Sequence, residues 1–368
     1  MKVLFQSRKT LFSVPGGDTI QIIKTAEYLK CYGCYVDIST DLEPDVSDYD
    51  IVHIFNFMRP QEVYLQVLNG KKQGKKVALS TIYGPYKEYY EHEHESTIEL
   101  LLGRLKPEYL EYLKIIGRAL INGELHKGTL IFLKRGQMQL QRQILKMVDI
   151  LLPNSEKELK RVFKHFPEAE RKIFVLVPNA VDQKLFNLDK VEITPEMEKY
   201  RNCVLCVARL EGRKSQLKLV QAMERLPWQL VLIGKPAKNH SFYLKQIKKE
   251  MGPNVHLIGQ VDHNLLPRYY KVARVHALVS WMETPGLSSL EAGAMGCNLV
   301  ITEKGDTREY FENFAFYCDP YSVDSIREAI IKAYQTPVNQ ALRERIMNNF
   351  TWDKAAEKTL EGYRKILL

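Results

Sequence analysis

The sequence contains no apolar run of the ~20 residues that a membrane-spanning helix needs. Near the start, Val3-Leu4-Phe5 is too short for the apolar core of a signal peptide. Cysteine is also sparse, with 6 among 368 residues. Without a secretory signal, so few thiols are typical of a reduced protein rather than of a disulfide framework. We therefore expect a cytoplasmic protein without disulfides.

The sequence also lacks a convincing metal signature. Cys203 and Cys206 have the spacing of a zinc-binding pair, but they lie three apart in an expected strand and so face opposite sides of it. We assign them to core packing. Asp48-Tyr49-Asp50 spells the metal-binding D-x-D motif, yet it leads into a strand instead of following one, so we read it as a solvated turn. Residues 91–95 alternate glutamate with histidine and are interpreted as a solvated stretch.

Acidic residues are outnumbered, and the formal charge is +9 with a pI near 9.0. Such a balance indicates an anionic partner, which is a nucleotide, a nucleic acid or a lipid surface. Residues 100–147 hold nine Lys or Arg against three Glu, a net of +6. Two readings of this segment stay open. It is either a solvated helical face or a basic surface for anionic lipid, to which each cation contributes ~1 kcal/mol.

Short apolar runs alternate with helix-like segments along the whole chain, which is typical of parallel sheets crossed by helices. At 368 residues, two domains are expected. We predict an α/β protein with a first Rossmann-like domain over 1–187, a helical insertion at about 86–147, a linker over 188–200, a second Rossmann-like domain over 201–350 and a C-terminal helix over 351–368. The expected strands are 2–6, 35–38, 51–54, 77–80 and 173–177, followed by 203–208, 229–233, 255–258, 275–279, 298–302 and 315–317.

The stretch 280–297 is the most informative part of the chain. It follows a run that reads as a buried parallel strand, so its turn lies at a strand's carboxyl end. Thr284 is expected to N-cap a helix, with Pro285 at the first position and Gly286 allowing a ligand close to the backbone. A helix N-terminus of this kind binds anions.

Two carboxylates flank this turn. Glu283 precedes the expected helix and Glu291 lies about six residues inside it, so at ~1.5 Å per residue the two are on the order of 10 Å apart. At that separation they bracket a ligand and do not share a proton.

Two cations follow the first strand of the second domain. Arg209 and Lys214 lie on a polar turn that leaves the same sheet edge as the Glu283 turn. A guanidinium and an ammonium together suit a leaving diphosphate that gains charge in the transition state. The alternative is a pair of surface charges around a helix N-terminus.

Taken together, these motifs resemble the retaining GT-B glycosyltransferases of family 4, the glycosyl transferases group 1. The resemblance covers nearly the whole chain. Glu283 and Glu291 match the family's E-x7-E motif, and Arg209 with Lys214 matches its Arg-x4-Lys pair. The segment 178–182, Pro-Asn-Ala-Val-Asp, is similar to the family's P-N-G-V-D.

The resemblance implies two parallel sheets facing a central cleft, and a UDP- or GDP-sugar donor held mainly by the second domain. In it, Glu283 holds hydroxyls of the transferred sugar, Glu291 holds the ribose, and Arg209 with Lys214 neutralises the diphosphate. Further donor contacts are implied for Pro285, Gly286, Leu287, Ser288, Lys235, Pro236, Gly259 and Gln260. Members of the family need no metal or other cofactor, and their C-terminal helix crosses back to the first domain.

In the first domain, Gly16 and Gly17 match the family's glycine loop, which contacts donor or acceptor. A turn that needs positive φ is the alternative explanation. Many members carry a histidine where this sequence places Tyr83. Tyr83 either supplies a hydroxyl to the donor sugar or is a buried loop tyrosine. The acceptor implied is a saccharide or a lipid-linked saccharide, with contact to an anionic membrane left open.

The expected reaction is metal-independent hexosyl transfer with retention, by a front-face route in which the leaving phosphate takes the acceptor's proton. Three other functions remain as alternatives: a glycoside hydrolase, a GT-B-like nucleotide-sugar epimerase, and a non-enzymatic anion or nucleic-acid binding module. The hydrolase is an alternative because inverting enzymes of that class use two carboxylates ~6.5–9.5 Å apart. No basic-aromatic nucleic-acid motif is present, and we expect no nucleic-acid partner.

Overall fold

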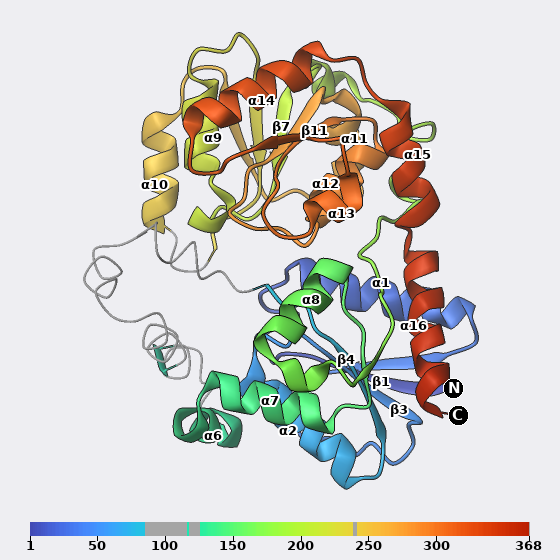
Figure 1. The fold of residues 1–368 in the computed structure, drawn as a ribbon. Helices are drawn as coiled ribbons and strands as arrows, with labels where there is room; N and C mark the ends of the chain where they lie inside the picture. Colours follow the sequence, from blue (N-terminus) through green and yellow to red (C-terminus); the bar gives the residue numbers. More distant parts are fainter. Residues whose placement is uncertain (85–115, 118–125, 238–240, 368) are drawn as a thin grey trace. The chain divides into compact units, whose positions relative to one another are not determined.

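The chain was analysed as a computed structural model that describes residues 1–84, 116–117, 126–237 and 241–367. These residues form two compact units (Figure 1). The first unit holds 1–84, 116–117, 126–179 and 352–367, and the second holds 180–237 and 241–351. Most of the predicted helical insertion at 86–147, together with the residues 91–95, lies outside the described part of the chain.

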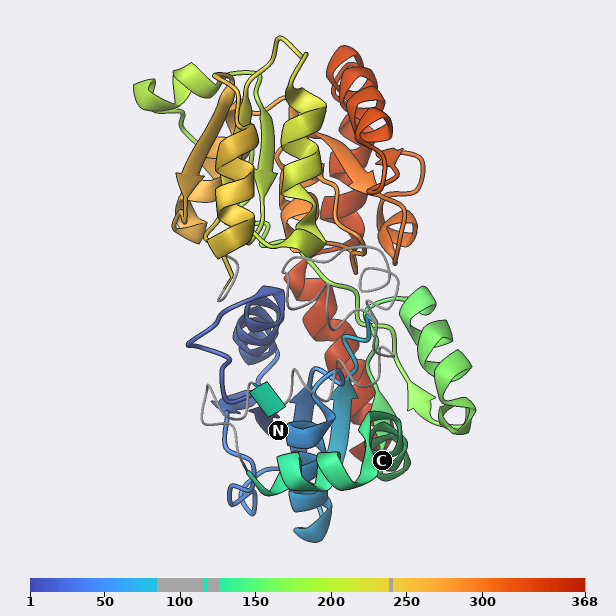
Figure 2. The ribbon, with the colours of Figure 1, turned by 90° about the vertical axis from the view of Figure 1, so that its left-hand side faces the viewer.

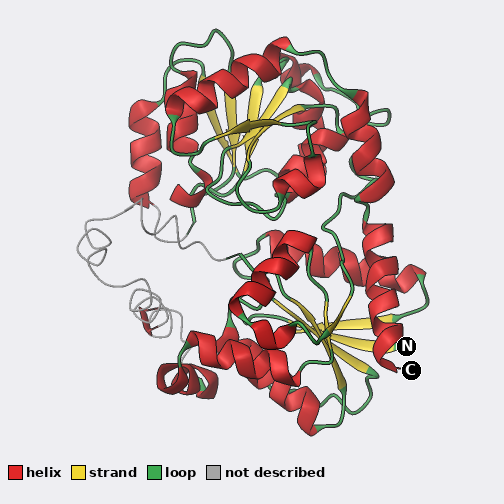
Figure 3. Cartoon of the chain, viewed as in Figure 1, coloured by secondary structure: helices red, strands yellow, loops and turns green. Residues whose placement is uncertain are grey.

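The first unit is built on a six-stranded parallel sheet in the order β2-β1-β3-β4-β5-β6 (Figure 3). Its strands are β1 (Lys2–Gln6), β2 (Tyr35–Ser39), β3 (Ile51–Phe55), β4 (Lys76–Ser80), β5 (Ile150–Leu151) and β6 (Ile173–Phe174). Its helices are α1 (Gly17–Cys31), α2 (Pro60–Lys72), α6 (Lys127–Arg135), α7 (Gln137–Met147), α8 (Glu156–His165), the 3₁₀ turn η1 (Pro167–Ala169) and α16 (Trp352–Leu367).

Helices cover both faces of this sheet (Figure 2). Because side chains alternate along a strand, Val52 and Ile54 of β3 face the core under α2, α7 and α8. His53 and Phe55 face the other side, where rings of Phe5 and of Tyr363 from α16 pack against them.

Helix α16, the last of the chain, packs beside α1 in the first unit. A Cβ at Gly362 would lie 2.8 Å from the Leu152 side chain, so glycine allows the helix to approach the sheet closely. His53 also connects α16 to the sheet. Its Nδ1 lies 2.6 Å from the hydroxyl of Tyr363 on α16, and its Nε2 lies 2.9 Å from the hydroxyl of Ser80 on β4.

The second unit has its own six-stranded parallel sheet, in the order β12-β11-β10-β7-β8-β9. Its strands are β7 (Val204–Val207), β8 (Leu230–Ile233), β9 (Val255–Gly259), β10 (Val275–Leu278), β11 (Asn298–Thr302) and β12 (Phe316–Cys318). Its helices are α9 (Gln216–Met223), α10 (Ser241–Glu250), α11 (Leu266–Val272), α12 (Leu287–Ala294), α13 (Thr307–Phe311), α14 (Val323–Gln335) and α15 (Gln340–Asn349), with 3₁₀ turns η2 (Pro195–Tyr200), η3 (Gly212–Lys214) and η4 (His263–Leu265).

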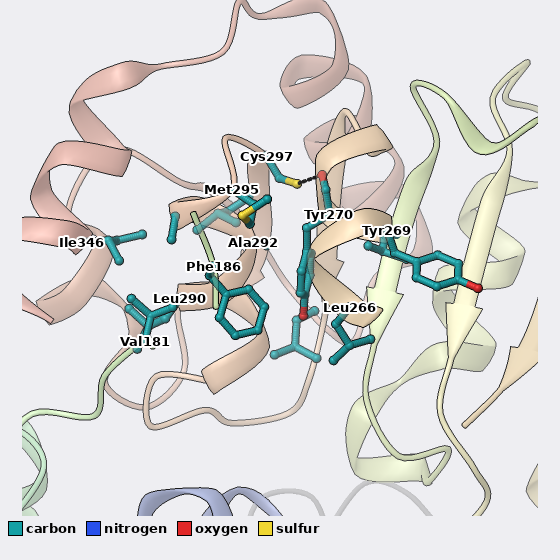
Figure 4. Close-up of a cluster of buried hydrophobic side chains, with 14 of the residues drawn as sticks. Val181, Phe186, Leu266, Tyr269, Tyr270, Leu290, Ala292, Met295, Cys297 and Ile346 are labelled. Atoms are coloured by element: carbon teal, nitrogen blue, oxygen red, sulfur yellow. Dashed lines mark hydrogen bonds between the residues drawn. The ribbon is translucent and has the colours of Figure 1, made fainter. Parts of the chain in front are cut away.

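Two hydrophobic cores sandwich the second sheet, one under α9, α10 and α14, the other under α11, α12, α13 and α15. Cys206 belongs to the first of these cores and Cys203 to the second, which confirms that they face opposite sides of the strand. Figure 4 shows the second core, where the Cys297 thiol lies 3.2 Å from the Tyr270 carbonyl oxygen. All six cysteines are free thiols.

The predicted α/β class with two Rossmann-like units is confirmed, although several boundaries differ. β5 is not among the predicted strands, because two residues are too few to show a pattern. Residues 180–187, assigned above to the first domain, belong to the second unit, since Val181 and Phe186 fill its core. Much of the predicted linker also packs there, through Leu188, Val191, Ile193, Met197 and Tyr200. Among the described residues no helix combines the length and the apolar character needed to cross a membrane.

Candidate functional site

The charged motifs of the second unit gather at the topological switch point of its sheet. β7 lies between β8 and β10, so the chain leaves β7 toward one edge of the sheet and later returns to build the other. Parallel α/β sheets bind ligands at the carboxyl ends of the strands where the order reverses. The turn after β7 carries Arg209 and Lys214, and the turn after β10 carries Glu283.

Backbone hydrogen bonds join these turns into one surface. The N–H of Trp281 donates to the Arg213 carbonyl oxygen at 3.0 Å, which links the β10 turn to the β7 turn. The N–H of Glu283 donates to the Lys304 carbonyl oxygen at 3.2 Å, which links it to the turn after β11. Gly305 in that turn has φ +91°, and a Cβ there would lie 2.2 Å from the Glu283 carbonyl oxygen. The position of Glu283 therefore depends on a glycine 22 residues later in the chain.

Lys214 and Glu283 meet directly. The Lys214 ammonium donates a hydrogen bond to Oε1 of Glu283, a residue that is only 8% exposed. Gly286 has φ +87°, and a Cβ there would lie 2.7 Å from the Leu278 side chain and 3.4 Å from Oε2 of Glu283. Glycine at 286 thus leaves room for the carboxylate. The predicted cation and the predicted acid are brought together.

Arg209 lies on the same turn but faces a different acid. Its Nη2 lies 3.7 Å from Oε1 of Glu211, and Nη2 of Arg213 lies 2.9 Å from the same oxygen. Glu211 is buried. The side-chain amide of Gln216 donates a hydrogen bond to the Arg209 carbonyl oxygen at 2.7 Å. Counting Lys214 and Glu283 as well, the turns after β7 and β10 carry three cations and two carboxylates, an excess of one positive charge on these two turns. Such an excess suits an anionic ligand.

Glu291, the second acid of the motif, lies on α12 and has two hydrogen-bond partners. His263 of η4 places Nε2 2.8 Å from Oε1, and the Tyr270 hydroxyl of α11 donates to Oε2 at 3.0 Å. Burial, followed by the neighbouring Glu291 carboxylate, raises the pKa of Tyr270 well above its ordinary value, so this hydroxyl stays a donor. Tyr270 and Phe186 point into the same cluster in Figure 4, and the Phe186 ring packs against His263 at 5.3 Å. Glu283 and Glu291 therefore have separate partners, in agreement with their expected independence.

The start of α12 differs from the prediction. The helix begins at Leu287 with Gly286 as its N-cap residue, and no side chain caps it. Thr284 therefore does not cap it and Pro285, which is buried, precedes it. The left-handed φ of Gly286 moves the start by two positions, and Glu291 becomes the fifth helical residue. Because Ser289 makes the first intrahelical bond, to the Gly286 carbonyl at 3.0 Å, the N–H groups of Leu287 and Ser288 lie ahead of the helical ladder.

The residues predicted to lie near the base are at the carboxyl ends of β8 and β9. Lys235, Pro236 and Gln260 are exposed and Gly259 is half-buried. The N–H of Gly234 donates to the Gly259 carbonyl oxygen at 2.8 Å, and the N–H of Leu210 donates to the Lys235 carbonyl oxygen at 3.0 Å. These turns are therefore continuous with the turn of Arg209.

In the first unit, Gly16 is the N-cap residue of α1 and Gly17 its first residue. Gly16 has φ −147°, so the alternative of a turn that needs positive φ does not apply. The loop before it is held by Arg8, which donates to both Asp18 oxygens at 2.7 and 3.0 Å and to the Val14 carbonyl oxygen at 2.9 Å. Burial raises the pKa of Asp18, but hydrogen bonds and charge from Arg8 outweigh it and lower that pKa below its ordinary value.

Tyr83 lies in the hydrophobic core of the first unit. Its hydroxyl lies 2.7 Å from Nδ1 of His165, and its ring packs against Phe57 and Phe166. Burial raises the pKa of Tyr83 to about 12. Its backbone N–H donates to the buried Glu158 at 2.8 Å. This environment favours the buried tyrosine over the donor-contacting one.

Sequence reasoning missed several residues that shape the site. Glu211 and Arg213 stand inside the Arg-x4-Lys turn, and His263 and Tyr270 follow β9. Charged residues on a turn after a strand were a usable signal for the first pair. The second pair had none, because their role depends on the packing of η4 and α11 against α12. No cluster of three His, Cys, Asp or Glu side chains able to hold a metal occurs within the described ranges.

The geometry can be set beside known proteins. Residues 191–351 match the family model of glycosyl transferases group 1. The matched segment holds Arg209, Lys214, Glu283 and Glu291 and lies in the second unit.

The chain is 24% identical over 188 residues to the O-antigen chain mannosyltransferase B of Escherichia coli, a match that covers 47% of this chain and 49% of that protein. The chain thus spans about half the length of the curated relatives it matches.

Among solved structures, sucrose-phosphate synthase of Thermosynechococcus elongatus aligns with a TM-score of 0.73 at 17% identity, over 100% of this chain and 99% of that one. Anabaena HepE in complex with UDP and glucose aligns with a TM-score of 0.69 at 13% identity, over 100% of both chains. These likenesses show the GT-B fold, and the family model supports the glycosyl transferases group 1.

Proposed function

We propose that this chain is a retaining glycosyltransferase that moves a hexosyl unit from a nucleotide-diphosphate sugar to an acceptor hydroxyl. The family model and the names of the relatives indicate a transferase enzyme. The observation that carries the proposal is the Lys214–Glu283 pair at the switch point, with the start of α12 immediately after it. It combines a cation, an acid and the N–H groups of a helix start at one sheet edge.

The donor lies along this edge. Lys214 and Arg209 neutralise the diphosphate, aided by the N–H groups of Leu287 and Ser288. Glu283 holds hydroxyls of the transferred sugar through the oxygen that Lys214 does not bind. The ribose hydroxyls bind Glu291, and the base lies near Lys235, Pro236, Gly259 and Gln260. A UDP- or GDP-sugar is the proposed donor. Support for UDP comes from Anabaena HepE, whose structure was solved in complex with UDP and glucose.

The chemistry follows from the charges. The bond from the anomeric carbon to the phosphate oxygen breaks, and the acceptor oxygen bonds to the same face of that carbon. The acceptor proton passes to the departing phosphate oxygen, so no protein nucleophile is consumed and no metal is invoked. Lys214 and Arg209 stabilise the charge that builds on the diphosphate, which is the kind of preorganised stabilisation that contributes most to rate. The acceptor is a glycan or a lipid-linked saccharide, bound by the first unit.

The test is release of nucleoside diphosphate from a panel of UDP-, GDP- and ADP-sugars, with and without added saccharides. We expect one donor to be turned over, and Glu283→Gln to lower the rate by about 100-fold or more, as for loss of a transition-state contact. Glu198→Gln is the matched control, because that exposed glutamate of η2 pairs with Arg201 at 2.6 Å and belongs to none of these turns. Turnover of no donor, or equal rates for Glu283→Gln and Glu198→Gln, contradicts the proposal.

A further inference from the structure

Helix α6 of the first unit exposes apolar and cationic side chains on one face. Its buried residues are Gly128, Thr129 and Phe132, which pack toward α2 and α7. Gly128 is held so closely that a Cβ there would lie 2.0 Å from the Gln61 carbonyl oxygen. Helix α6 is therefore firmly seated, and its other side faces away from the core.

Two leucines lie on that outer side. Leu130 is 59% exposed and Leu133 is 38% exposed, and at 100° per residue they are neighbours on the helical surface. Met138, in the first turn of α7, is 47% exposed. A large apolar side chain left in water is ordinary when single, whereas two neighbours on one side of α6, with a third in the first turn of the next helix, indicate an interaction surface.

Cations adjoin the leucines. Lys127 and Lys134 fall beside Leu130 on the same arc of the helix, and Arg135 ends it. Lys134 and Arg135 are exposed, and Lys127 is exposed as well. Residues 126–147 contain no aspartate or glutamate at all, against five Lys or Arg. Of these five, Arg142 is paired with Glu168 at 3.3 Å and is therefore left out of the surface.

We infer that the α6 surface, defined as Lys127, Leu130, Leu133, Lys134, Arg135 and Met138, docks on an anionic lipid bilayer. Leucine and methionine side chains enter the boundary between headgroups and acyl chains, while the cations bind lipid phosphates. An amphipathic helix with basic residues bordering its apolar face lies in this plane. A nucleic acid would leave the leucines in water, whereas an anionic bilayer takes up the leucines and the cations together.

The test is co-sedimentation of the full chain with vesicles of phosphatidylcholine alone, or with about 30% phosphatidylglycerol, at about 0.1 and 0.5 M salt, where screening differs strongly. We expect binding only to the anionic vesicles. The triple variant Lys127→Gln, Lys134→Gln, Arg135→Gln should bind on the order of 100-fold more weakly at about 0.1 M salt, since each cation contributes ~1 kcal/mol. Leu130→Gln with Leu133→Gln should bind about tenfold or more weakly at both salts, because burial of methylene groups is not screened.

Helix α10 of the second unit is a matched control. It exposes Lys245, Lys248 and Lys249 together with Phe242, which is 56% exposed. Replacing these three lysines by glutamine removes the same charge and should change vesicle affinity by less than about threefold. Circular dichroism checks that each variant is folded, as expected for exposed positions.

Several outcomes overturn the inference. The first is that the wild-type chain does not bind the anionic vesicles. The second is equal weakening by the α6 and α10 variants, which would mean that net charge alone attracts the chain to the vesicles. The third is a change of oligomeric state in the leucine variant with vesicle binding intact, which would make the α6 surface a contact between copies of the chain. Because the vesicle experiment contains no nucleotide sugar, its result is independent of the proposed transfer reaction.

Discussion

The Glu291 carboxylate owes its orientation to donors from two other elements. His263 and Tyr270 each bind one of its oxygens, at 2.8 and 3.0 Å. Tyr270 is fully buried, whereas His263 is half-buried and can be changed without opening the core. His263 is thus a positioning residue for the proposed ribose contact.

Replacement of His263 by alanine should weaken binding of the preferred nucleoside diphosphate by about tenfold, the value of a hydrogen bond to a charged group. Binding of the 2′,3′-dideoxy analogue should be unchanged, because that ligand has no hydroxyls for Glu291. His263→Gln should recover part of the affinity, since its amide carries an N–H donor. Calorimetric titration measures all three. Equal weakening for both ligands would show that His263 acts on the fold and not through the ribose.

Among single residues, the charged side chains of the proposed donor site could be predicted from the sequence, whereas most of the residues that hydrogen-bond to them could not. Arg209, Lys214, Glu283 and Glu291 stand out because charged side chains beside strand ends and glycines are unusual. Glu211 and Arg213 carried a usable signal as charged residues on a turn after a strand. Tyr270 does not stand out, because its hydrogen bond to Glu291 is revealed only by the fold. Tyr83 shows the limit of motif matching, since its position in the chain left a donor contact and a buried tyrosine both open, while its contacts with His165 and Phe166 place it in the core.

At the scale of elements, the turns at the carboxyl ends of β10 and β11 hold each other in place. Gly305 at φ +91° approaches the Glu283 carbonyl oxygen so closely that any side chain must displace one turn.

Gly305→Ala should lower the free energy of unfolding by about 3 kcal/mol, from the strained φ and the overlap together. Gly33→Ala is the control, because Gly33 has φ +75° with no atom within 4 Å of its added Cβ. That variant should lose only about 1 kcal/mol. Urea denaturation followed by circular dichroism gives both values. Similar losses for the two variants would mean that the contact with Glu283 is unimportant for stability.

Helix α16 depends on a buried histidine. Burial lowers the pKa of His53 to about 3, so the folded protein keeps the imidazole neutral between the Tyr363 and Ser80 hydroxyls. An unfolded histidine takes up a proton below about pH 6.5, whereas this one does not until about pH 3. The stabilisation is therefore complete above about pH 6.5 and is lost progressively as the pH falls toward about 3.

The free energy of unfolding of the first unit should fall below about pH 6.5 by up to ~1.4 kcal/mol per pH unit from His53. His53→Gln keeps hydrogen-bonding groups but does not titrate, so its unfolding should depend less on pH while being less stable at about pH 7.5. Denaturation curves at about pH 7.5, 6.5 and 5.5, read from the first unit's near-ultraviolet signal, compare the slopes. Burial lowers the pKa of His276 in the second unit to about 3 as well, so a residual dependence is expected there. Identical slopes for wild type and His53→Gln would contradict the assignment.

Elements were predictable where pattern and length were both sufficient. β1 and β11 have the predicted bounds, because in each strand a run of three apolar residues stands between two polar ones. The start of α12 was misplaced because its N-cap depends on Gly286 adopting a left-handed φ, which no propensity rule reveals. β5 and the end of β6 were missed because two-residue strands are defined by pairing alone.

For the whole molecule, the two parallel sheets could be predicted from the alternation of strands and helices in the sequence. The boundary between the two units could not be predicted in this way. Residues 180–200 look like a polar linker in the sequence, yet Val181, Phe186 and Tyr200 are core residues of the second unit. A polar segment with a few well-spaced apolar residues is indistinguishable from a linker until its contacts are known. The second unit therefore carries the entire proposed donor site, from Arg209 to Glu291, on one sheet edge.

In the proposed transferase, this edge binds the diphosphate of a nucleotide sugar through Lys214 and Arg209. Calorimetric titration of the full chain with UDP, GDP and ADP, and with the matching monophosphates, tests it most directly. We expect at least one diphosphate to bind. Lys214→Met should weaken its binding by about 10- to 100-fold and affect the monophosphate much less, since a charge-assisted hydrogen bond is worth about 1.5–3 kcal/mol. Absence of binding by all three diphosphates, or undiminished binding to Lys214→Met, would contradict it.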